Sequence, residues 1–289
     1  EAKNATFLFH RDFMEYHKDR FEDFSLLIYE YENLIGIVPA HIKGNMFCSH
    51  FGLSYGGIIY NKYWKSTDLS TVILKVSQFL SSFKIKEWII KPIPNFYDEN
   101  NMGIDWEKHG FLECNTDLLL RIDYSDYQIS KSKLKHFKRR QHLNYCIKES
   151  MLDEFWEDVL SPLLSRKYDV KPVHSFSEIN YLKEKFPKNI KQFSLYFNDE
   201  IHAGITIFES EYVVKSQYGA TTEYGKSIRA LDLLFIHLIK YFEEQGKLFF
   251  DMGTVMDSSF ENNINTGLLN QKKELGCKEC LFKTYRKIL

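Results

Sequence analysis

The sequence predicts a mixed α/β fold of two similar lobes in tandem, each a mixed, largely antiparallel sheet flanked by helices. The first observation is an internal repeat, in which a run of elements recurs after about 170 residues. The second is an amphipathic helical pattern at the same place in each half. The third is a short apolar strand pattern directly after each helix.

Each half begins with three predicted strands separated by polar turns. In the first half these are residues 24–29, 36–40 and 45–51, and in the second half 193–197, 204–208 and 212–218. The third strand of each half runs up to a glycine, Gly52 or Gly219. Five elements in the same order with similar gaps favour a duplication. The alternative is that the similarity reflects only the alternation of strands and helices that any α/β protein shows.

The helices follow the third strands. Apolar residues recur at helical spacing in both halves: Leu69, Val72, Val76, Phe79 and Leu80, and Ile228, Leu231, Phe235, Leu238 and Phe242. Gly246 suits a C-terminal cap. Apolar strands at 87–90 and 248–251 come next, so each half implies a sheet with a helix packed on it.

We therefore expect an N-terminal lobe at 1–128, a basic helical connector at 129–150 and a C-terminal lobe at 151–289. Between Asp126 and Glu149 the chain holds no acidic residue but several cations, including Lys138 and Arg139. This run is either a solvated connector or a face that binds a phosphorylated substrate.

Composition narrows the class of protein. The 289 residues are 44% hydrophobic and 27% charged, which is typical of a globular chain. A net charge of -1 disfavours a general nucleic-acid binder, and no apolar run has the length of a membrane helix. Five scattered cysteines indicate the cytoplasm rather than a disulfide framework, and a single CxxC (Cys277, Cys280) predicts no metal site.

The second half carries a family resemblance. Its segments 217–220, 225–234, 250–253 and 265–272 resemble the GNAT superfamily of acyltransferases, and more narrowly the two-lobed Fem-like branch. That branch contains peptidoglycan-bridge aminoacyltransferases and bacterial sugar-nucleotide N-acyltransferases. Segments 50–57 and 171–175 are most similar to the latter, in particular to dTDP-aminosugar N-acyltransferases that use a hydroxybutanoyl thioester.

The resemblance implies where coenzyme A binds. In GNAT proteins the fourth strand ends beside the thioester, and the next helix begins at the pyrophosphate, where free N–H groups and the helix dipole favour phosphate. Carried over, the cofactor contacts are Gln217, Gly219, Ala220, Gly225, Lys226, Ser227, Arg229 and Ala230. The loop lacks the family's second glycine. Ser227 is alternatively an ordinary helix N-cap.

Three residues are candidates for proton transfer. His174 lies in a loop flanked by Pro172 and is either a base or a surface histidine. Asp251 interrupts an apolar strand, so it must be paired, protonated or exposed in a cleft. The family's tyrosine after the fifth strand is missing, so Tyr218 is a candidate to protonate the leaving thiolate, with Tyr285 or water as the alternatives.

The acceptor site is expected to involve both lobes. The first lobe lacks a phosphate loop, so we expect it to be a degenerate copy that shapes the acceptor site. The candidate contacts are His50, Tyr55, Lys138, Arg139, Asn265, Gln271 and Lys272, although caps and surface amides are common alternatives.

The expected function is therefore N-acylation of a nucleotide-linked aminosugar by acyl-CoA in surface-polysaccharide synthesis, by direct attack of the amine on the thioester. The alternatives are a peptidoglycan-bridge aminoacyltransferase and a non-catalytic GNAT-like binding module. No nucleic-acid or membrane partner is expected, and a homodimer is an open possibility.

Overall fold

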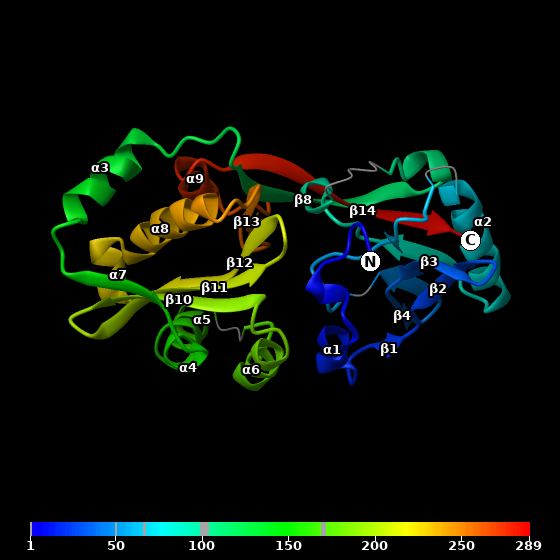
Figure 1. Ribbon diagram of the computed structural model, residues 1–289, viewed down its shortest axis with the longest axis horizontal. Coiled ribbons are helices and arrows are strands. Elements are labelled where there is room, and N and C mark those ends of the chain that lie inside the picture. Colours follow the sequence, from blue (N-terminus) through cyan, green and yellow to red (C-terminus); the bar gives the residue numbers. More distant parts are fainter. Residues whose placement is uncertain (1, 50, 66–67, 99–103, 169–171) are drawn as a thin grey trace. The chain divides into compact units, whose positions relative to one another are not determined.

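The computed structural model describes residues 2–49, 51–65, 68–98, 104–168 and 172–289. The chain forms two compact units (Figure 1). Unit 1 consists of 1–117 and 281–289, and unit 2 consists of 118–280. The strands β8 (Leu112–Asp123) and β14 (Lys278–Ile288) each cross from one unit into the other.

Unit 1 contains two sheets, with strand orders β1-β4-β5-β7-β14 and β2-β3-β6. Its elements are η1 (Phe7–Phe9), α1 (Arg11–Met14), η2 (Glu15–His17), β1 (Glu22–Asp23), β2 (Leu26–Glu30), β3 (Asn33–Val38), β4 (Ala40–Lys43), β5 (Met46–Ser49), β6 (Ile59–Tyr60), α2 (Asp68–Ser82), β7 (Glu87–Ile90), η3 (Asn95–Tyr97) and η4 (Glu107–His109).

One predicted strand of unit 1 is divided in the structure. Residues 36–40 were expected to form a single strand, but β3 ends at Val38 and β4 begins at Ala40. Pro39 lies between them and has no backbone N–H to give to a ladder. The two strands pair in different sheets, β3 with β2 and β4 with β1 and β5.

The core of unit 1 lies between α2 and the sheets. Val72, Val76 and Leu80 of the predicted helical stripe are buried against Phe47 and Trp88. Phe79 differs from this expectation, since 43% of its surface is exposed. It lies at the border of the stripe, next to the fully buried Leu80.

Unit 2 has one sheet in the order β8-β13-β12-β11-β10-β9. Its elements are α3 (Lys131–Arg140), β9 (Tyr145–Glu149), α4 (Leu152–Glu154), η5 (Phe155–Leu160), α5 (Ser161–Tyr168), α6 (Phe176–Lys185), β10 (Ile190–Phe197), β11 (Glu200–Glu209), β12 (Val213–Thr221), α7 (Glu223–Ile228), α8 (Ala230–Glu244), β13 (Phe249–Thr254) and α9 (Thr266–Glu274).

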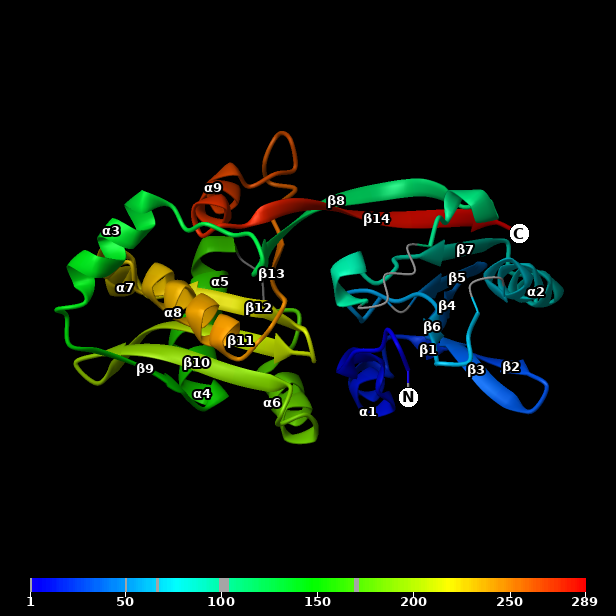
Figure 2. The ribbon, with the colours of Figure 1, turned by 45° about the horizontal axis from the view of Figure 1, so that its top comes forward.

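Helices cover both faces of this sheet (Figure 2). The helix α8 packs on β10, β11 and β12, and its Leu234, Leu238 and Phe242 are fully buried. On the other face η5 packs on β11 and β12, and α6 packs on β10. As expected, Gly246 follows α8 with a left-handed φ of 76°.

The basic segment 129–150 lies within unit 2. Its strand β9 pairs antiparallel with β10, and Leu134 and Phe137 of α3 pack against the unit 2 core. Lys133 of the same helix is buried and forms a 2.6 Å ion pair with Asp232 of α8. The segment is therefore a structural part of the second unit as well as a basic surface.

The end of the chain completes unit 1. Residues 285–288 of β14 pair antiparallel with β7 (Tyr285 opposite Ile90, Ile288 opposite Glu87), and Phe282 is buried. In exchange, β8 pairs with β13 of unit 2. The lobe boundaries inferred from the repeat did not contain this exchange of strands.

A chain that ends after Cys280 should therefore lose stability in unit 1. Loss of the buried Phe282 side chain alone costs about 3 kcal/mol or more, and β7 loses one of its two neighbours in the sheet. Hydrogen exchange of the β7 amides should become much faster, whereas the β10 amides in unit 2 serve as the internal control and should keep their protection. Unchanged protection of β7 would contradict this role of β14.

Candidate functional site

The candidate site lies where the strands β12 and β13 of unit 2 stop pairing. The two strands are parallel, and their registered pairs are Val213 with Phe249, Val214 with Phe250 and Lys215 with Asp251. On its other side β12 continues to pair with β11 up to Thr221. In the described part of the chain, residues 216–221 thus have no strand partner on the β13 side.

A bulge lies at the start of this unpaired edge. Thr206 of β11 pairs with Tyr218 and Ile207 pairs with Ser216, so Gln217 is an extra residue in β12. A bulge bends its strand and redirects the side chains that follow it. The Gln217 Oε1 atom is buried and accepts no hydrogen bond from the described residues. A ligand N–H group would satisfy this acceptor.

Two small residues continue the edge. Gly219 faces α8, since an added Cβ would lie 3.7 Å from the Phe235 ring and 3.9 Å from Leu231. Ala220 is buried in the core. The three predicted cofactor contacts in this part of β12, Gln217, Gly219 and Ala220, therefore lie together at the diverging edge.

The predicted phosphate loop is mostly a short helix. Thr222 caps α7, accepting a hydrogen bond from the Gly225 amide at 2.9 Å, and Ser227 donates within the same helix to the Tyr224 carbonyl. Ser227 is thus not the N-cap of the following helix. At Gly225 a Cβ would lie 2.3 Å from the His202 carbonyl oxygen, so the glycine allows α7 to pack tightly on β11.

The long helix α8 begins after a left-handed residue. Arg229 has φ 57° and ψ 41°, and its side chain does not cap the helix. The first helical bond runs from the Leu233 amide to the Arg229 carbonyl. The preceding amides, from the buried Ala230 onward, form the free N-terminus of α8 and carry its positive dipole end.

Several cations surround this helix start. Partial desolvation, followed by the charges of Arg229, Arg140, Arg139 and Lys133, lowers the pKa of His136 on α3. Arg139 and the exposed Lys138 come from the last turn of α3. The structure therefore places Arg139 and Arg229, which are 90 positions apart in sequence, in one positive field.

Two other side chains at this end are already engaged. Lys226 forms a 2.6 Å ion pair with Glu223, which also binds Arg166. Gln271 of α9 donates to Asp232 in the first turn of α8 at 3.1 Å. The Gln271 contact joins α9 to the start of α8, and the Arg166 contact joins α7 to α5.

His174 and Tyr218 form a close pair on the face of the sheet opposite α8. The His174 Nδ1 atom lies 2.5 Å from the Tyr218 Oη, and the His174 amide donates to the same oxygen at 3.2 Å. The Tyr218 ring packs edge-on against Trp156. His174 is held there because it directly precedes Ser175, which caps α6 in a capping box with Glu178.

Burial raises the pKa of Tyr218 to about 12. The phenol is therefore protonated at neutral pH and can act as a proton donor. The structure thus brings together two candidate residues that the sequence suggested separately.

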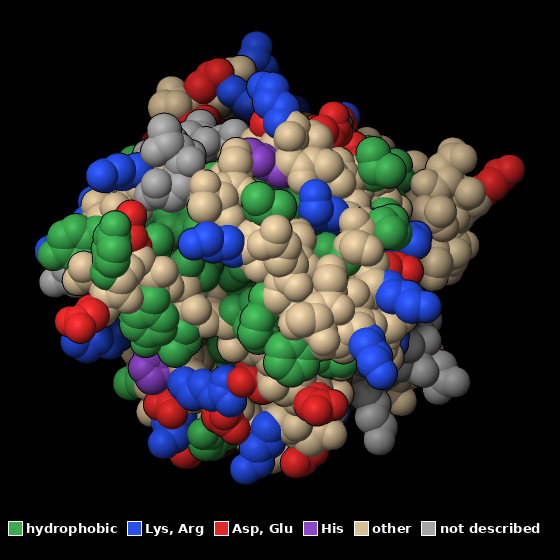
Figure 3. Space-filling model, turned by 90° about the vertical axis from the view of Figure 1, so that its right-hand side faces the viewer, with side chains coloured by type: hydrophobic (Ala, Val, Ile, Leu, Met, Phe, Trp, Pro, Cys, Tyr) green, Lys and Arg blue, Asp and Glu red, His purple; other side chains and the backbone are tan. Residues whose placement is uncertain are grey.

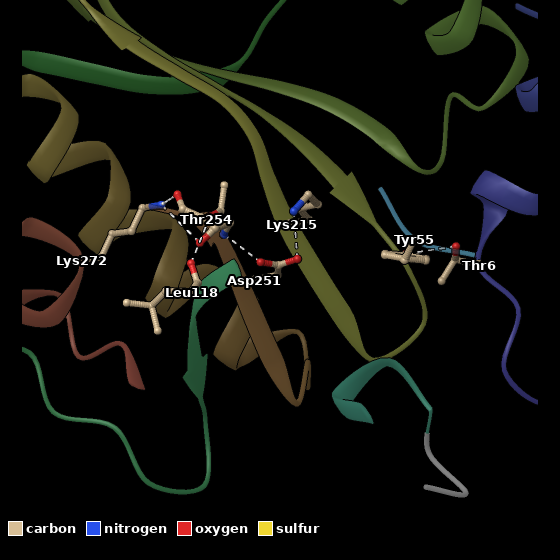
Figure 4. Close-up of polar contacts among 8 residues, drawn as sticks. Thr6, Tyr55, Leu118, Lys215, Asp251, Thr254 and Lys272 are labelled. Atoms are coloured by element: carbon tan, nitrogen blue, oxygen red, sulfur yellow. Dashed lines mark hydrogen bonds and ion pairs between the residues drawn. The ribbon is translucent and has the colours of Figure 1, made fainter. Parts of the chain in front are cut away.

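Asp251 is paired rather than exposed (Figure 4). Its carboxylate accepts a 3.0 Å bond from Lys215 Nζ and a 2.7 Å bond from the Gly253 amide. Only 2% of the Asp251 side chain is exposed. Of the possibilities that the sequence left open, an ion pair is the one observed. This geometry suits a residue that positions strands rather than one that accepts a proton.

Lys272 fixes the end of β13. Its Nζ atom donates to the Thr254 carbonyl at 2.9 Å and to the Gly253 carbonyl at 3.4 Å (Figure 4). Burial is the largest effect on its pKa, which is lowered to about 8. Lys272 was expected to contact the acceptor, but in this structure its donors are directed to the backbone.

The remaining acceptor candidates are distributed over both units. Asn265 caps α9 by accepting from the Leu268 amide at 3.0 Å. In unit 1, Tyr55 is buried and donates to Thr6 Oγ1 at 3.1 Å (Figure 4). His50 lies outside the described residues.

Sequence reasoning missed Lys215 and Trp156. Lys215 interrupts an apolar strand in the same way as Asp251, and two opposite charges in neighbouring predicted strands were a usable signal for their pairing. Trp156 gave no such signal, because an aromatic residue in an apolar helix is typical of a core.

Comparison with known proteins gives a likeness of fold. No protein-family model and no curated protein matches the chain. The structure resembles FemX with a TM-score of 0.72 and 10% identity, over 100% of this chain and 94% of that chain. It resembles L-PGS from Bacillus licheniformis with a TM-score of 0.61 and 14% identity, over 92% and 84%.

A GNAT-family acetyltransferase from Colwellia psychrerythraea is also similar, with a TM-score of 0.53 and 9% identity over 99% of this chain and 90% of that chain. At such identities the likeness concerns the fold. It confirms the predicted α/β class with GNAT-like lobes. Among the described residues, no helix has both the length and the apolar character needed to cross a membrane.

The lowered pKa of Lys272 predicts a pH-dependent stability. The folded value of about 8 lies below the ordinary 10.5, so the unfolded chain binds more protons between these values. The contribution of Lys272 is fully present above about pH 10.5 and is lost as the pH falls through about 8. From about pH 7 to about pH 10, wild type should gain about 1–3 kcal/mol relative to Lys272→Met in urea unfolding.

Lys273→Met is the matched control for this experiment, because Lys273 is the exposed neighbour in the same helix. Its unfolding free energy should change with pH in parallel with wild type. A Lys272→Met curve that also runs parallel to wild type would show that the ammonium is not desolvated in the folded chain.

Proposed function

We propose that this chain is an N-acyltransferase that moves an acyl group from acyl-CoA to the amino group of a nucleotide-linked aminosugar. The observation that carries the proposal is the edge of β12 at residues 216–221 that does not pair with β13, followed after the short helix α7 by the free N-terminus of α8. The edge of β12 can form backbone hydrogen bonds with an extended chain that contains amides. The N-terminus of α8 offers N–H groups to a phosphate.

The proposed position of coenzyme A follows from this arrangement. The pantetheine arm contains two amides, which suit the open edge of β12 and the buried acceptor Gln217 Oε1. The pyrophosphate would lie at the start of α8, where the helix dipole, Arg229 and Arg139 supply positive charge. Because Lys226 is paired with Glu223, it has a weaker part in this model than the sequence suggested.

The proposed reaction is direct transfer. A neutral amine attacks the thioester carbonyl, the C–N bond forms and the C–S bond breaks, and one proton moves from nitrogen to sulfur. Backbone N–H groups at the open edge of β12 would stabilise the oxyanion. The proton would pass through the Tyr218 hydroxyl, which gives a proton to the leaving sulfur and regains one from the nitrogen.

His174 would prepare Tyr218 for this task. If its Nδ1 carries the proton, the Tyr218 oxygen accepts two hydrogen bonds from His174, one from the ring and one from the amide. The phenol's own proton is then directed to the ligand, and the two donors stabilise the phenolate that forms. Asp251 is assigned a positioning role through Lys215.

The acceptor class rests on sequence. Segments 50–57 and 171–175 resemble sugar-nucleotide N-acyltransferases, and the basic helix α3 offers Lys138 and other exposed cations to a phosphorylated acceptor. The second candidate function is aminoacyl transfer from charged tRNA. It is favoured by the likeness of fold to FemX, which covers 100% of this chain and 94% of that chain.

Mass spectrometry of products tests the proposal. The full chain is incubated with a panel of nucleotide-linked aminosugars and several acyl-CoA thioesters, including a hydroxybutanoyl thioester, and with aminoacyl-tRNA in a separate arm. We expect an added acyl mass on at least one aminosugar. Product only in the aminoacyl-tRNA arm would favour the second candidate, and no product together with no thermal stabilisation by coenzyme A would favour a binding module.

Tyr218→Phe should lower kcat about 100-fold while KM changes little, because the variant keeps the ring but lacks the transferable proton. The matched control is Tyr196→Phe, since the Tyr196 hydroxyl binds Glu154 instead and its loss should leave kcat within about twofold. Steady-state rates with the active pair from the panel measure both variants. Full activity of Tyr218→Phe would remove Tyr218 from the proton path.

A further inference from the structure

A groove on unit 1 lies outside the proposed site. It encloses about 650 Å³ between β2 and α2. Its lining consists of the consecutive residues 26–31 on one side and Thr71, Lys75 and Phe79 of α2 on the other, with Val72, Val76 and Ile35 at the base. The volume is in the range of ligand-binding pockets.

The groove follows the free edge of β2. In the described chain, β2 is the outer strand of the β2-β3-β6 sheet and pairs only with β3. Alternate side chains of a strand point to opposite faces. A groove lined by every residue from 26 to 31 must therefore run along the strand edge, where the unpaired N–H and C=O groups lie.

This edge has little of the protection that edge strands usually carry. Residues 26–31 read Leu-Leu-Ile-Tyr-Glu-Tyr and contain no proline or lysine, the residues that commonly block edge pairing. Leu27 and Tyr29 are more than half exposed, at 59% and 56%. Figure 3 shows hydrophobic side chains gathered on this face of the molecule, with charged side chains around them.

Two opposite charges mark the groove. Lys75 of α2 and Glu30 at the end of β2 both line it. Neither side chain forms an ion pair with the other described residues. An occupant with a carboxylate would complement Lys75, and this contact would be only partly screened beside apolar walls.

We propose that the groove binds an extended peptide segment of a partner protein, which adds to β2 as a further strand. The main chain of the peptide would pair with the free edge of β2, its alternate apolar side chains would pack between Tyr29 and Phe79, and a carboxylate would bind Lys75. The five residues of β2 span about 17 Å, so five or six peptide residues fill the edge.

A strand edge distinguishes this occupant from a hydrocarbon. An acyl chain can fill apolar space but leaves the backbone donors and acceptors of β2 unsatisfied when it covers them, which is costly. A peptide can fill the apolar space with its side chains and can also pair with the backbone donors and acceptors of β2. The proposal is independent of the acyltransferase site, because all lining residues belong to unit 1.

The test begins with a random hexapeptide display library selected on the immobilised full-length chain. We expect enriched sequences with alternating apolar residues and one Asp or Glu, and the best one is made as a synthetic peptide for fluorescence anisotropy. Two N-methylated forms, blocked at odd or at even amides, then test strand pairing. One form should lose binding and the other should keep it, because only alternate amides face β2.

Matched variants place the peptide in the groove. Leu27→Gln should weaken binding about tenfold, whereas Leu74→Gln should leave it within about twofold, since Leu74 is equally exposed at 58% but does not line the groove. Lys75→Glu should weaken peptides that carry the carboxylate. Sedimentation of the chain alone tests whether a second copy of the chain fills the groove. Competition of the peptide with oleate tests whether an acyl chain does.

Several outcomes would overturn the proposal. No enriched peptide, or equal binding of both N-methylated forms, would exclude strand addition by a peptide. A dimer of the chain that Leu27→Gln dissociates would show that a second copy fills the groove. Tight binding of oleate without any selected peptide would assign the groove to an acyl chain.

Discussion

The ion pair between Lys215 and Asp251 joins β12 and β13 at the point where the two strands separate. It occupies the last registered pair of β12 and β13, and both side chains are largely buried, with 15% and 2% exposed. Removing one partner of such a pair leaves an uncompensated buried charge and costs about 3–5 kcal/mol. Beyond this pair the Gln217 bulge and the left-handed Gly253 direct the two strands apart. The open edge, the Tyr218–His174 pair and the start of α8 all depend on that separation.

Much of the fold could be predicted because its signals are local. Helical spacing in α2 and α8, the turns between strands and Gly246 after α8 all lie within a few residues of what they determine. The exchange of β8 and β14 could not be predicted in this way. Tyr285 pairs with Ile90, from which it is 195 positions distant in sequence, and nothing near either residue specifies the partner. The repeat indicated two units but not which unit receives the last strand.

The candidate site residues could be chosen from the sequence, but their contacts within the chain could not be predicted from it. Tyr218 and His174 were singled out separately, and only the fold brings them to 2.5 Å. Asn265 and Gln271 were candidates for substrate, yet they bind the Leu268 amide and Asp232. Polar side chains near helix ends satisfy nearby backbone and side-chain groups first. A sequence shows that a residue can form hydrogen bonds but does not show whether these are already used within the chain.

A comparison of the two units accounts for the open edge of β12 to which we assign coenzyme A. In unit 1, β5 and β7 also run parallel for three pairs, and the third is the apolar pair Cys48 and Ile89 in place of Lys215 and Asp251. The chain then closes its own opening, because the Gly56 amide donates to the Lys91 carbonyl at 2.7 Å, and Gly56 forms a parallel bridge with Pro92. In unit 2, residues 216–221 have no such contact on the β13 side among the described residues. The same arrangement of strands therefore leaves a strand edge open in unit 2, whereas in unit 1 the segment around Gly56 pairs with the corresponding edge.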